Sequence, residues 1–185
     1  MSFLEHSKSF KGIVDIFLHD PRRYLPVAQL VAALMDGESA LSKAEREAIA
    51  LYVSVLNDCH YCVGSHRAVL AALGADEAML GDLAAGSRDH AAARLRPVLD
   101  LAHKLTATPG RVAEDDVAAA RAAGWPDSAI EDAIAIVSLF SLLNRLVDGM
   151  GIKGSAEGFR QAGAMVAEMG YGPVVQMVRQ KAEAA

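Results

Sequence analysis

The chain has 185 residues, the size of one domain, and a formal net charge of −5 from 18 basic and 23 acidic side chains. This balance argues against nucleic acid as a partner, because no excess of cations is available to neutralise phosphates. Hydrophobic residues make up 52% of the chain, which excludes a disordered protein. Aromatic residues are only 5%, a composition that favours helices over strands.

The distribution of apolar residues gives no reason to expect a membrane protein. The longest uncharged apolar run, 133–144, is shorter than the roughly 20 residues that a spanning helix needs. An acid, Glu5, lies in the first residues, and no apolar core of a signal peptide follows it. We therefore expect a cytoplasmic protein without a membrane partner, whose cysteines stay reduced.

Helical signals begin near residue 20 and continue through the first half of the chain. Ser42 and Glu45 form a capping box ahead of a strongly apolar segment, which predicts a central helix. Asn57 and Asp58 mark a short break, and Gly74 stands where a left-handed helix cap is expected. We expect these helices at about 21–36, 43–57, 59–73 and 76–86.

The second half of the chain continues the same pattern. Apolar residues recur at intervals of three and four, not two, so no strand is predicted. Asp127 is expected to cap a long apolar helix, and Pro97 to lie in the first turn of another. The further helices are expected at about 94–106, 114–123, 127–150, 155–169 and from 173 onward.

The predicted fold class is therefore all-α, a compact helical array of about eight or nine helices. We expect one domain over residues 1–185. Its core motif would be residues 41–74, with N-terminal helices in 1–40 and C-terminal helices in 127–185 packed on it.

The two cysteines carry the strongest chemical signal in the chain. Cys59 and Cys62 form a C-x-x-C sequence, and His66 follows four residues later. Two cysteines placed at random in a chain of this length would fall three apart about 1% of the time, by simple counting. On a helix, positions 59, 62 and 66 lie within an arc of about 60°, so both thiols and the imidazole share a face.

The break at 57–58 also predicts which residues face this cluster. If two antiparallel helices meet there, Ser54 lies opposite Cys62, and Glu47 lies within about one turn of His66. Glu47 is an acid at the edge of an apolar run. The same fold-back that buries this helix would therefore bring a carboxylate to the imidazole.

This set of side chains can activate a thiol. A thiol near pKa 8.5 must shift by roughly 1.5 units, or about 2 kcal/mol, to be half ionised at pH 7. A helix N-terminus supplies roughly 0.3–1 kcal/mol, so His66 would have to accept the proton, oriented by Glu47. The second cysteine would close a disulfide and protect the first from over-oxidation.

Simpler interpretations remain for each feature. The cysteines can be apolar core filler, and Cys59, Cys62 and His66 with Glu47 can also be arranged as metal ligands. The charges of Glu45 and Arg46 suggest a solvated face. A further pair, Asn144 and Arg145, interrupts an apolar helix as a buried polar link or an interface contact, and is not assigned to catalysis.

The stretch from Glu47 through Cys59, Cys62 and His66 resembles the core motif of the alkyl hydroperoxidase D and carboxymuconolactone decarboxylase superfamily. Residues 41–47 and 144–152 extend the resemblance, more narrowly to its uncharacterised peroxidase-related branch. The resemblance implies an all-helical homo-oligomer (trimer or hexamer). It also implies thiol-dependent reduction of a hydroperoxide, without a metal or other cofactor and with an external dithiol as reductant.

By the same resemblance, Cys62 matches the attacking cysteine and Cys59 the resolving one, while Glu47 and His66 match a proton relay. The helix dipole alone would favour Cys59 as the thiolate, but the imidazole four residues beyond Cys62 is the stronger proton acceptor. Tyr61 stands where the best-characterised members have a further histidine. A phenol cannot act as a base at neutral pH, but it can donate a hydrogen bond, so peroxidase activity would be weaker or the substrate different.

Two other functions stay open. A carboxymuconolactone-type decarboxylase would rely on histidine and acid without paired thiols. A metal-binding or redox-sensing oligomer without turnover would use the cysteines differently. The sequence itself favours the peroxidase interpretation, because the thiol pair has no role in the decarboxylase.

Overall fold

The computed structural model describes residues 2–184, and in that range it contains ten α-helices, two short 3-10 turns and no strand. The all-α prediction is confirmed. One helix more is present than the sequence indicated, because Ile13–His19 is too short to show a helical period. The α-helices are α1 (Ile13–His19), α2 (Pro21–Asp36), α3 (Lys43–Leu56), α4 (His60–Ala72), α5 (Glu77–Ala84), α6 (Arg96–Ala107), α7 (Glu114–Ala122), α8 (Asp127–Met150), α9 (Ala156–Met169) and α10 (Gly172–Glu183).

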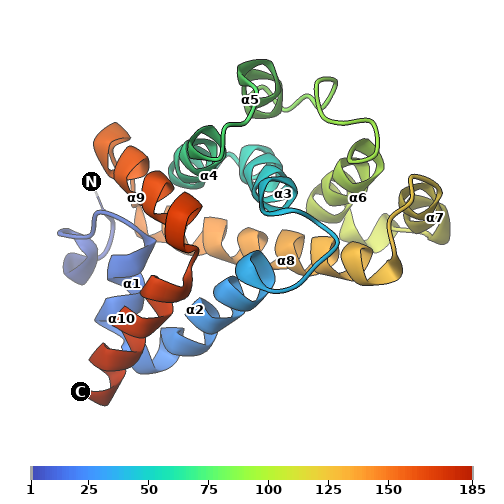
Figure 1. Ribbon diagram of the computed structural model, residues 1–185. Coiled ribbons are helices and arrows are strands. Elements are labelled where there is room, and N and C mark those ends of the chain that lie inside the picture. Colours follow the sequence, from blue (N-terminus) through green and yellow to red (C-terminus); the bar gives the residue numbers. More distant parts are fainter. Residues whose placement is uncertain (1, 185) are drawn as a thin grey trace.

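Helix α8 runs through the middle of the molecule, with α3 and α6 packed against it (Figure 1). In residues 2–184 it alone is long and apolar enough to cross a membrane by length and composition. It exceeds the uncharged run at 133–144 because the helix continues past charged residues at both ends. Its buried side chains contribute to one apolar core together with those of α3 and α6, as expected of a central helix.

The α3–α4 hairpin forms as its sequence predicts. The capping box of Ser42 and Glu45 begins α3, and Asp58 takes a left-handed conformation (φ 55°) in the turn that follows it. The N–H of Cys59 donates to the carbonyl of Ser54, 3.0 Å away, so α4 begins one residue after Cys59. Cys59 is therefore the N-cap residue of α4, and Cys62 lies in its first turn.

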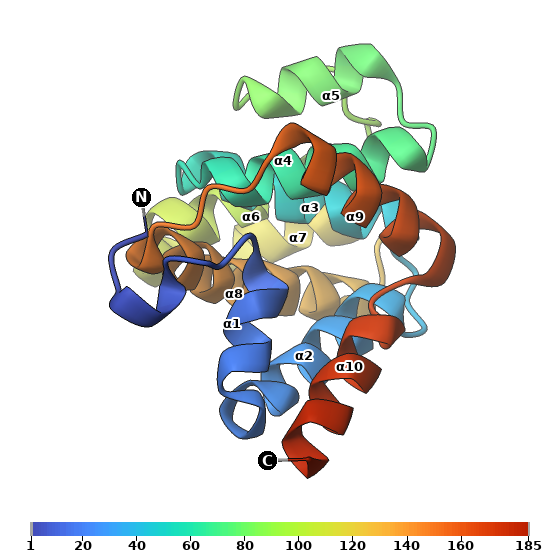
Figure 2. The same ribbon diagram turned by 90° about the vertical axis from the view of Figure 1, so that its left-hand side faces the viewer.

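Two glycines allow α9 to pack closely on α4. A Cβ at Gly163 would lie 2.7 Å from the backbone carbonyl carbon of Ala68, and a Cβ at Gly64 would lie 2.5 Å from the ring of Phe159. Figure 2 shows α9 lying along α4, while α1, α2 and α10 form a second group below them. The link between α9 and α10 is fixed to α2, because the N–H of Tyr171 donates to Asp36 Oδ2 at 2.7 Å.

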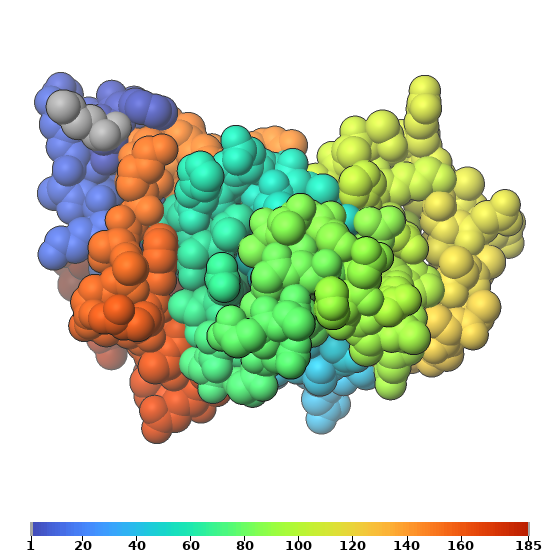
Figure 3. All heavy atoms as spheres, turned by 90° about the horizontal axis from the view of Figure 1, so that it is seen from above, coloured from blue at the N-terminus to red at the C-terminus, as the bar shows by residue number. Residues whose placement is uncertain are grey.

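The N-terminal segment lies against the link between α8 and α9. The N–H of Phe3 donates to the carbonyl of Met150 at 3.0 Å, and the segment then leads into α1. Figure 3 shows this part of the molecule beside α9, with α4 and α5 farther along the same face. The N-terminal segment, the α8–α9 link and α9 therefore form one continuous surface next to α4.

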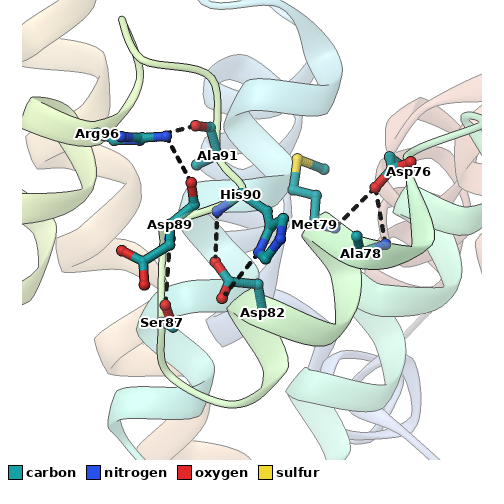
Figure 4. A network of polar contacts seen from close by, with 9 residues as sticks. All are labelled: Asp76, Ala78, Met79, Asp82, Ser87, Asp89, His90, Ala91 and Arg96. Carbon is teal, nitrogen blue, oxygen red and sulfur yellow. Dashed lines mark hydrogen bonds and ion pairs between the residues drawn. The ribbon is translucent and has the colours of Figure 1, made fainter.

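The connection from α5 to α6 is held by polar contacts of its own (Figure 4). Asp82 accepts a hydrogen bond from the N–H of His90, and this bond is the main cause that lowers the pKa of the carboxyl group. Arg96 donates to the carbonyls of Asp89 and Ala91. The connection contributes none of the candidate site residues.

Candidate active site

The turn at 57–58 brings an acid and an imidazole together in the core. Glu47 on α3 and His66 on α4 are both buried, and Glu47 Oε2 lies 2.7 Å from His66 Nδ1. Because Nδ1 faces the carboxylate, the other ring nitrogen, Nε2, is left to accept a proton. The Phe140 ring packs edge-on against the imidazole, with 4.5 Å between the ring centroids, and holds its orientation.

The second oxygen of the same carboxylate is also occupied. The hydroxyl of Tyr171 donates to Glu47 Oε1 at 2.8 Å, so both oxygens of a fully buried acid have a partner. Burial, followed by the nearby Glu47, raises the pKa of Tyr171 well above its ordinary value, so the phenol keeps its proton. Tyr171 is missing from the sequence prediction, because nothing in a tyrosine 124 residues from Glu47 indicates this contact.

The two cysteines are both free thiols, and their environments push their pKa values apart. A hydrogen bond from Cys59 is the main cause that lowers the pKa of Cys62, and the charge of His66 acts in the same direction. The same hydrogen bond and burial raise the pKa of Cys59. Cys62 therefore ionises more easily than an ordinary thiol, while Cys59 stays protonated and stabilises the Cys62 thiolate.

A buried amide contributes to the same effect. Hydrogen bonding by the amide of Asn144, on α8, is a further cause that lowers the pKa of Cys62. The Asn144 side chain also donates to Ser54 Oγ at 3.1 Å and accepts from Asn57 Nδ2 at 2.9 Å. Asn144 is therefore part of a buried polar link, one of the two alternatives expected for the pair 144–145, whereas Arg145 is exposed. The effect of Asn144 on the reactive thiol is a role that the sequence did not indicate.

Cys62 and His66 line a cavity of about 130 Å³, which we call the inner cavity. Cys62 is 5% exposed, whereas Cys59 is fully buried and does not line the cavity. The other walls are mostly apolar side chains from α1, α2, α4, α8, α9 and α10, among them Phe17, Val31, Val69, Leu143 and Val174. A small oxidant in the inner cavity would therefore meet one sulfur and one imidazole.

Tyr61 lines the same cavity, but its hydroxyl is directed towards α1. It accepts a hydrogen bond from the N–H of Ile13 at 3.0 Å, and its ring packs edge-on against Phe159. Burial raises the pKa of this phenol, so it is a hydrogen-bond donor or acceptor and not a base. Tyr61 thus lies between Cys62 and α1, and the sequence did not predict its hydrogen bond to α1.

The donor geometry does not favour the metal-binding alternative. In the described range 2–184, no group of three or more His, Cys, Asp or Glu side chains is placed to hold a metal ion. The nearest candidates, His66 Nδ1 and Glu47 Oε2, are directed towards each other. The four predicted residues are thus arranged as a thiol pair beside an acid–imidazole pair.

A C-x-x-C pair at the start of a helix lies next to a buried Glu–His pair in an all-helical fold, which is the arrangement that the sequence resemblance to the AhpD type implies. A model of the carboxymuconolactone decarboxylase family matches residues 24–104, and the chain belongs to this family. The family resemblance found in the sequence is thereby confirmed. The sequence matches no curated protein.

Two solved structures are similar over most of their length. An uncharacterized peroxidase-related protein from Silicibacter sp. TM1040 is 30% identical, with a TM-score of 0.74 over 81% of this chain and 79% of that one. An alkylhydroperoxidase AhpD core, an uncharacterized peroxidase-related protein from Ralstonia eutropha JMP134, is 30% identical, with a TM-score of 0.73 over 80% of this chain and 78% of that one. Both similarities confirm the AhpD-like fold.

Proposed function

We propose that the protein is a peroxidase-type oxidoreductase that reduces a hydroperoxide at Cys62, with Cys59 as the resolving cysteine. One observation carries the proposal: of the two sulfurs, only that of Cys62 lines the inner cavity, and the residues around it lower its pKa. A thiolate that a small molecule can reach is the attacking group that peroxide chemistry requires. The family membership and the peroxidase-related relatives support the same reaction class.

The proposed reaction balances with the groups present. The Cys62 thiol gives its proton to His66 Nε2, and the thiolate attacks the terminal oxygen of the hydroperoxide. The S–O bond forms as the O–O bond breaks, and the departing alkoxide takes the proton from His66 and leaves as an alcohol. Cys62 is then a sulfenic acid.

The second half of the cycle uses Cys59. Its thiol, held protonated beside Cys62, attacks the sulfenic sulfur; the S–S bond forms, the S–O bond breaks and water leaves. An external dithiol then supplies two electrons, becomes a disulfide itself and restores both thiols. Because Cys59 does not line the inner cavity, the peroxide is excluded from the resolving sulfur.

The remaining residues have supporting roles in this cycle. Glu47 orients His66 and stabilises its protonated form, and Tyr171 positions Glu47. Tyr61 lines the cavity next to Cys62, and we retain it as the candidate donor of a hydrogen bond to an oxygen of the substrate. No cofactor is needed for these steps.

The direct test is peroxide consumption by purified protein with a small dithiol as reductant. We expect turnover of tert-butyl hydroperoxide that is lost in Cys62→Ser and in Cys59→Ser. A wild-type protein that consumes no peroxide and whose cysteines do not cycle would contradict the proposal. Decarboxylation of a carboxymuconolactone that survives replacement of both cysteines would favour the alternative function.

We further propose a homo-oligomer, a trimer or hexamer, in the cytoplasm. Support comes from large apolar side chains that are exposed on the described surface, including Leu30, Leu142, Met169 and Met177. Light scattering of the purified protein tests the assembly. A mass equal to that of one chain would contradict it.

A further inference from the structure

A second hollow lies beside the inner cavity, and its charge is positive. This outer pocket, of about 680 Å³, is lined by the N-terminal segment, the α8–α9 link, the start of α9 and two residues of α4. Lys8, Lys11 and Lys153 line it, and no acidic residue does. The chain as a whole carries a net charge of −5, so three cations around one hollow are a local departure from the rest of the molecule.

The lysines differ in whether an acid neutralises them. Lys8 is paired with Glu5 at 2.6 Å, with both side chains exposed. Lys11 and Lys153 take part in no ion pair within residues 2–184. The carboxylate of Asp15 is bound to the backbone N–H groups of Lys11 and Gly12, at 2.6 and 3.1 Å, and is not part of the pocket lining. Two ammonium groups are therefore available to an anion.

One aromatic side chain separates the outer pocket from the reactive thiol. Tyr61, Ser65 and Ala162 line both hollows. The Tyr61 ring is held so closely that a Cβ at Gly12 would lie 2.5 Å from its hydroxyl oxygen, and a Cβ at Gly154 would lie 2.9 Å from a ring carbon. Both glycines line the outer pocket, so Tyr61, together with Ser65 and Ala162, forms the boundary between this pocket and the cavity that Cys62 lines.

The two hollows suit two different parts of one molecule. A cavity of about 150 Å³ is large enough for benzene, so the inner cavity, at about 130 Å³, admits only a compact apolar group. A carboxylate would be excluded from it, because burying an ionised group among apolar side chains is costly. The outer pocket is larger, is cationic and can hold that carboxylate.

We infer that the substrate is an amphiphilic organic hydroperoxide, whose peroxide-bearing apolar end enters the inner cavity while its carboxylate stays with Lys11 and Lys153 in the outer pocket. The inference rests on the proposed peroxidase function, and adds the class of peroxide to it. Tyr61 sets the boundary between the two ends of the substrate. The reaction at Cys62 is the one given above.

The test uses hydroperoxides of six-, nine- and twelve-carbon carboxylic acids, each with the peroxide on the terminal carbon, together with their methyl esters. Each acid and its methyl ester share the same chain and the same peroxide, and the ester replaces the charged carboxylate with a neutral group, so the ratio of their kcat/KM values measures recognition of the carboxylate. At low salt we expect the acid to be preferred about tenfold once the chain is long enough to pass Tyr61, and we expect added salt to reduce the preference.

Two variants locate the effect. In Lys11→Met/Lys153→Met the acid-to-ester ratio should fall to about one. Lys181→Met on α10, which removes an exposed lysine outside the outer pocket, should keep the wild-type ratio. Because each ratio is an internal comparison, partial loss of folded protein does not change it.

The outcomes separate this inference from the proposed function. Turnover of tert-butyl hydroperoxide with an acid-to-ester ratio of one in the wild type would overturn the inference alone, and so would a ratio unchanged in the double variant. No turnover of any hydroperoxide would overturn both. An effect of the double variant confined to the KM of an anionic dithiol, absent for a neutral one, would assign the pocket to the reductant and overturn the assignment to substrate.

Discussion

Tyr171 and Glu47 are joined by a hydrogen bond of 2.8 Å that connects the α9–α10 link to the central helix α3. Because the other oxygen of the carboxylate contacts His66, the docking of the C-terminal helix and the orientation of the imidazole depend on one acid. The carboxylate is fully buried, so it needs both partners. Tyr171 is thus a positioning residue that acts through Glu47.

Tyr171→Phe should lower kcat/KM for a hydroperoxide by about tenfold, the lower end of the roughly 10–100-fold loss that follows removal of a group orienting a metal-bound histidine. The free energy of unfolding should fall by about 1–3 kcal/mol, since one buried oxygen loses its partner. The dependence of kcat/KM on pH distinguishes this positioning role of Tyr171 from a purely structural role. A profile identical to that of the wild type, with reduced stability alone, would contradict the positioning role.

The pH dependence of the reaction should report the lowered pKa of Cys62. Since the thiolate is the nucleophile, kcat/KM should rise with pH and level off above an inflection that lies below the ordinary thiol value of about 8.5. Thiolate absorbance at 240 nm gives the same inflection without turnover. In Cys59→Ala the inflection should move upward, because Cys62 loses the hydrogen bond that contributes most to its lowered pKa.

Cys62→Ala is the matched control for this titration. The remaining thiol, Cys59, is buried, and burial raises its pKa. It should therefore show no thiolate near neutral pH. A thiolate that persists in Cys62→Ala would mean that the two cysteines have been assigned in the wrong order.

Asn144→Ala should raise the pKa of Cys62 and lower kcat/KM at neutral pH, because the amide no longer hydrogen-bonds to the sulfur. The substitution also removes the hydrogen-bond partner of the side chains of Asn57 and Ser54. Activity measured at a pH above the new inflection separates the two effects. Recovery of the rate there supports a role in ionisation, and a loss equal at all pH values would contradict it.

Gly163→Ala should push α9 away from α4 and destabilise the protein by about 1–3 kcal/mol, since its Cβ would meet backbone atoms of Ala68 that cannot rotate away. Gly149→Ala in α8 is the matched control. Its Cβ would meet nothing within 4 Å, so it should be neutral or stabilise by about 0.5–1 kcal/mol. Chemical denaturation measures the free energy of unfolding of both variants. Equal stability of the two variants would contradict the close packing.

The sequence predicted the contacts that a single turn determines. Glu47 meets His66 because the break at 57–58 folds two adjacent helices together, and this register follows from counting residues on either side of the turn. Asn144 reaches the same site from α8, and Tyr171 reaches it from the α9–α10 link. No local sequence pattern predicts how helices far apart in the chain pack together. The contacts that Asn144 and Tyr171 make in the site could therefore be identified only from the structure.

Arg46 is a charged residue whose buried environment could likewise not be predicted from the sequence. The sequence suggested a solvated face at 45–46, and that interpretation is wrong for Arg46, which is buried and donates to the carbonyls of Leu34 and Gly37. These carbonyls lie at the end of α2, where helix acceptors lack partners of their own. An arginine that binds the end of a distant helix cannot be distinguished from a solvated one by its neighbours in sequence.

The most direct test of the central claim is to trap the sulfenic acid after one equivalent of hydroperoxide, with mass analysis of the single-cysteine variants. In Cys59→Ser we predict a sulfenic acid at Cys62, because the resolving thiol is missing. In Cys62→Ser we predict unmodified Cys59. A sulfenic acid at Cys59 in Cys62→Ser, with Cys62 unmodified in Cys59→Ser, would contradict the account.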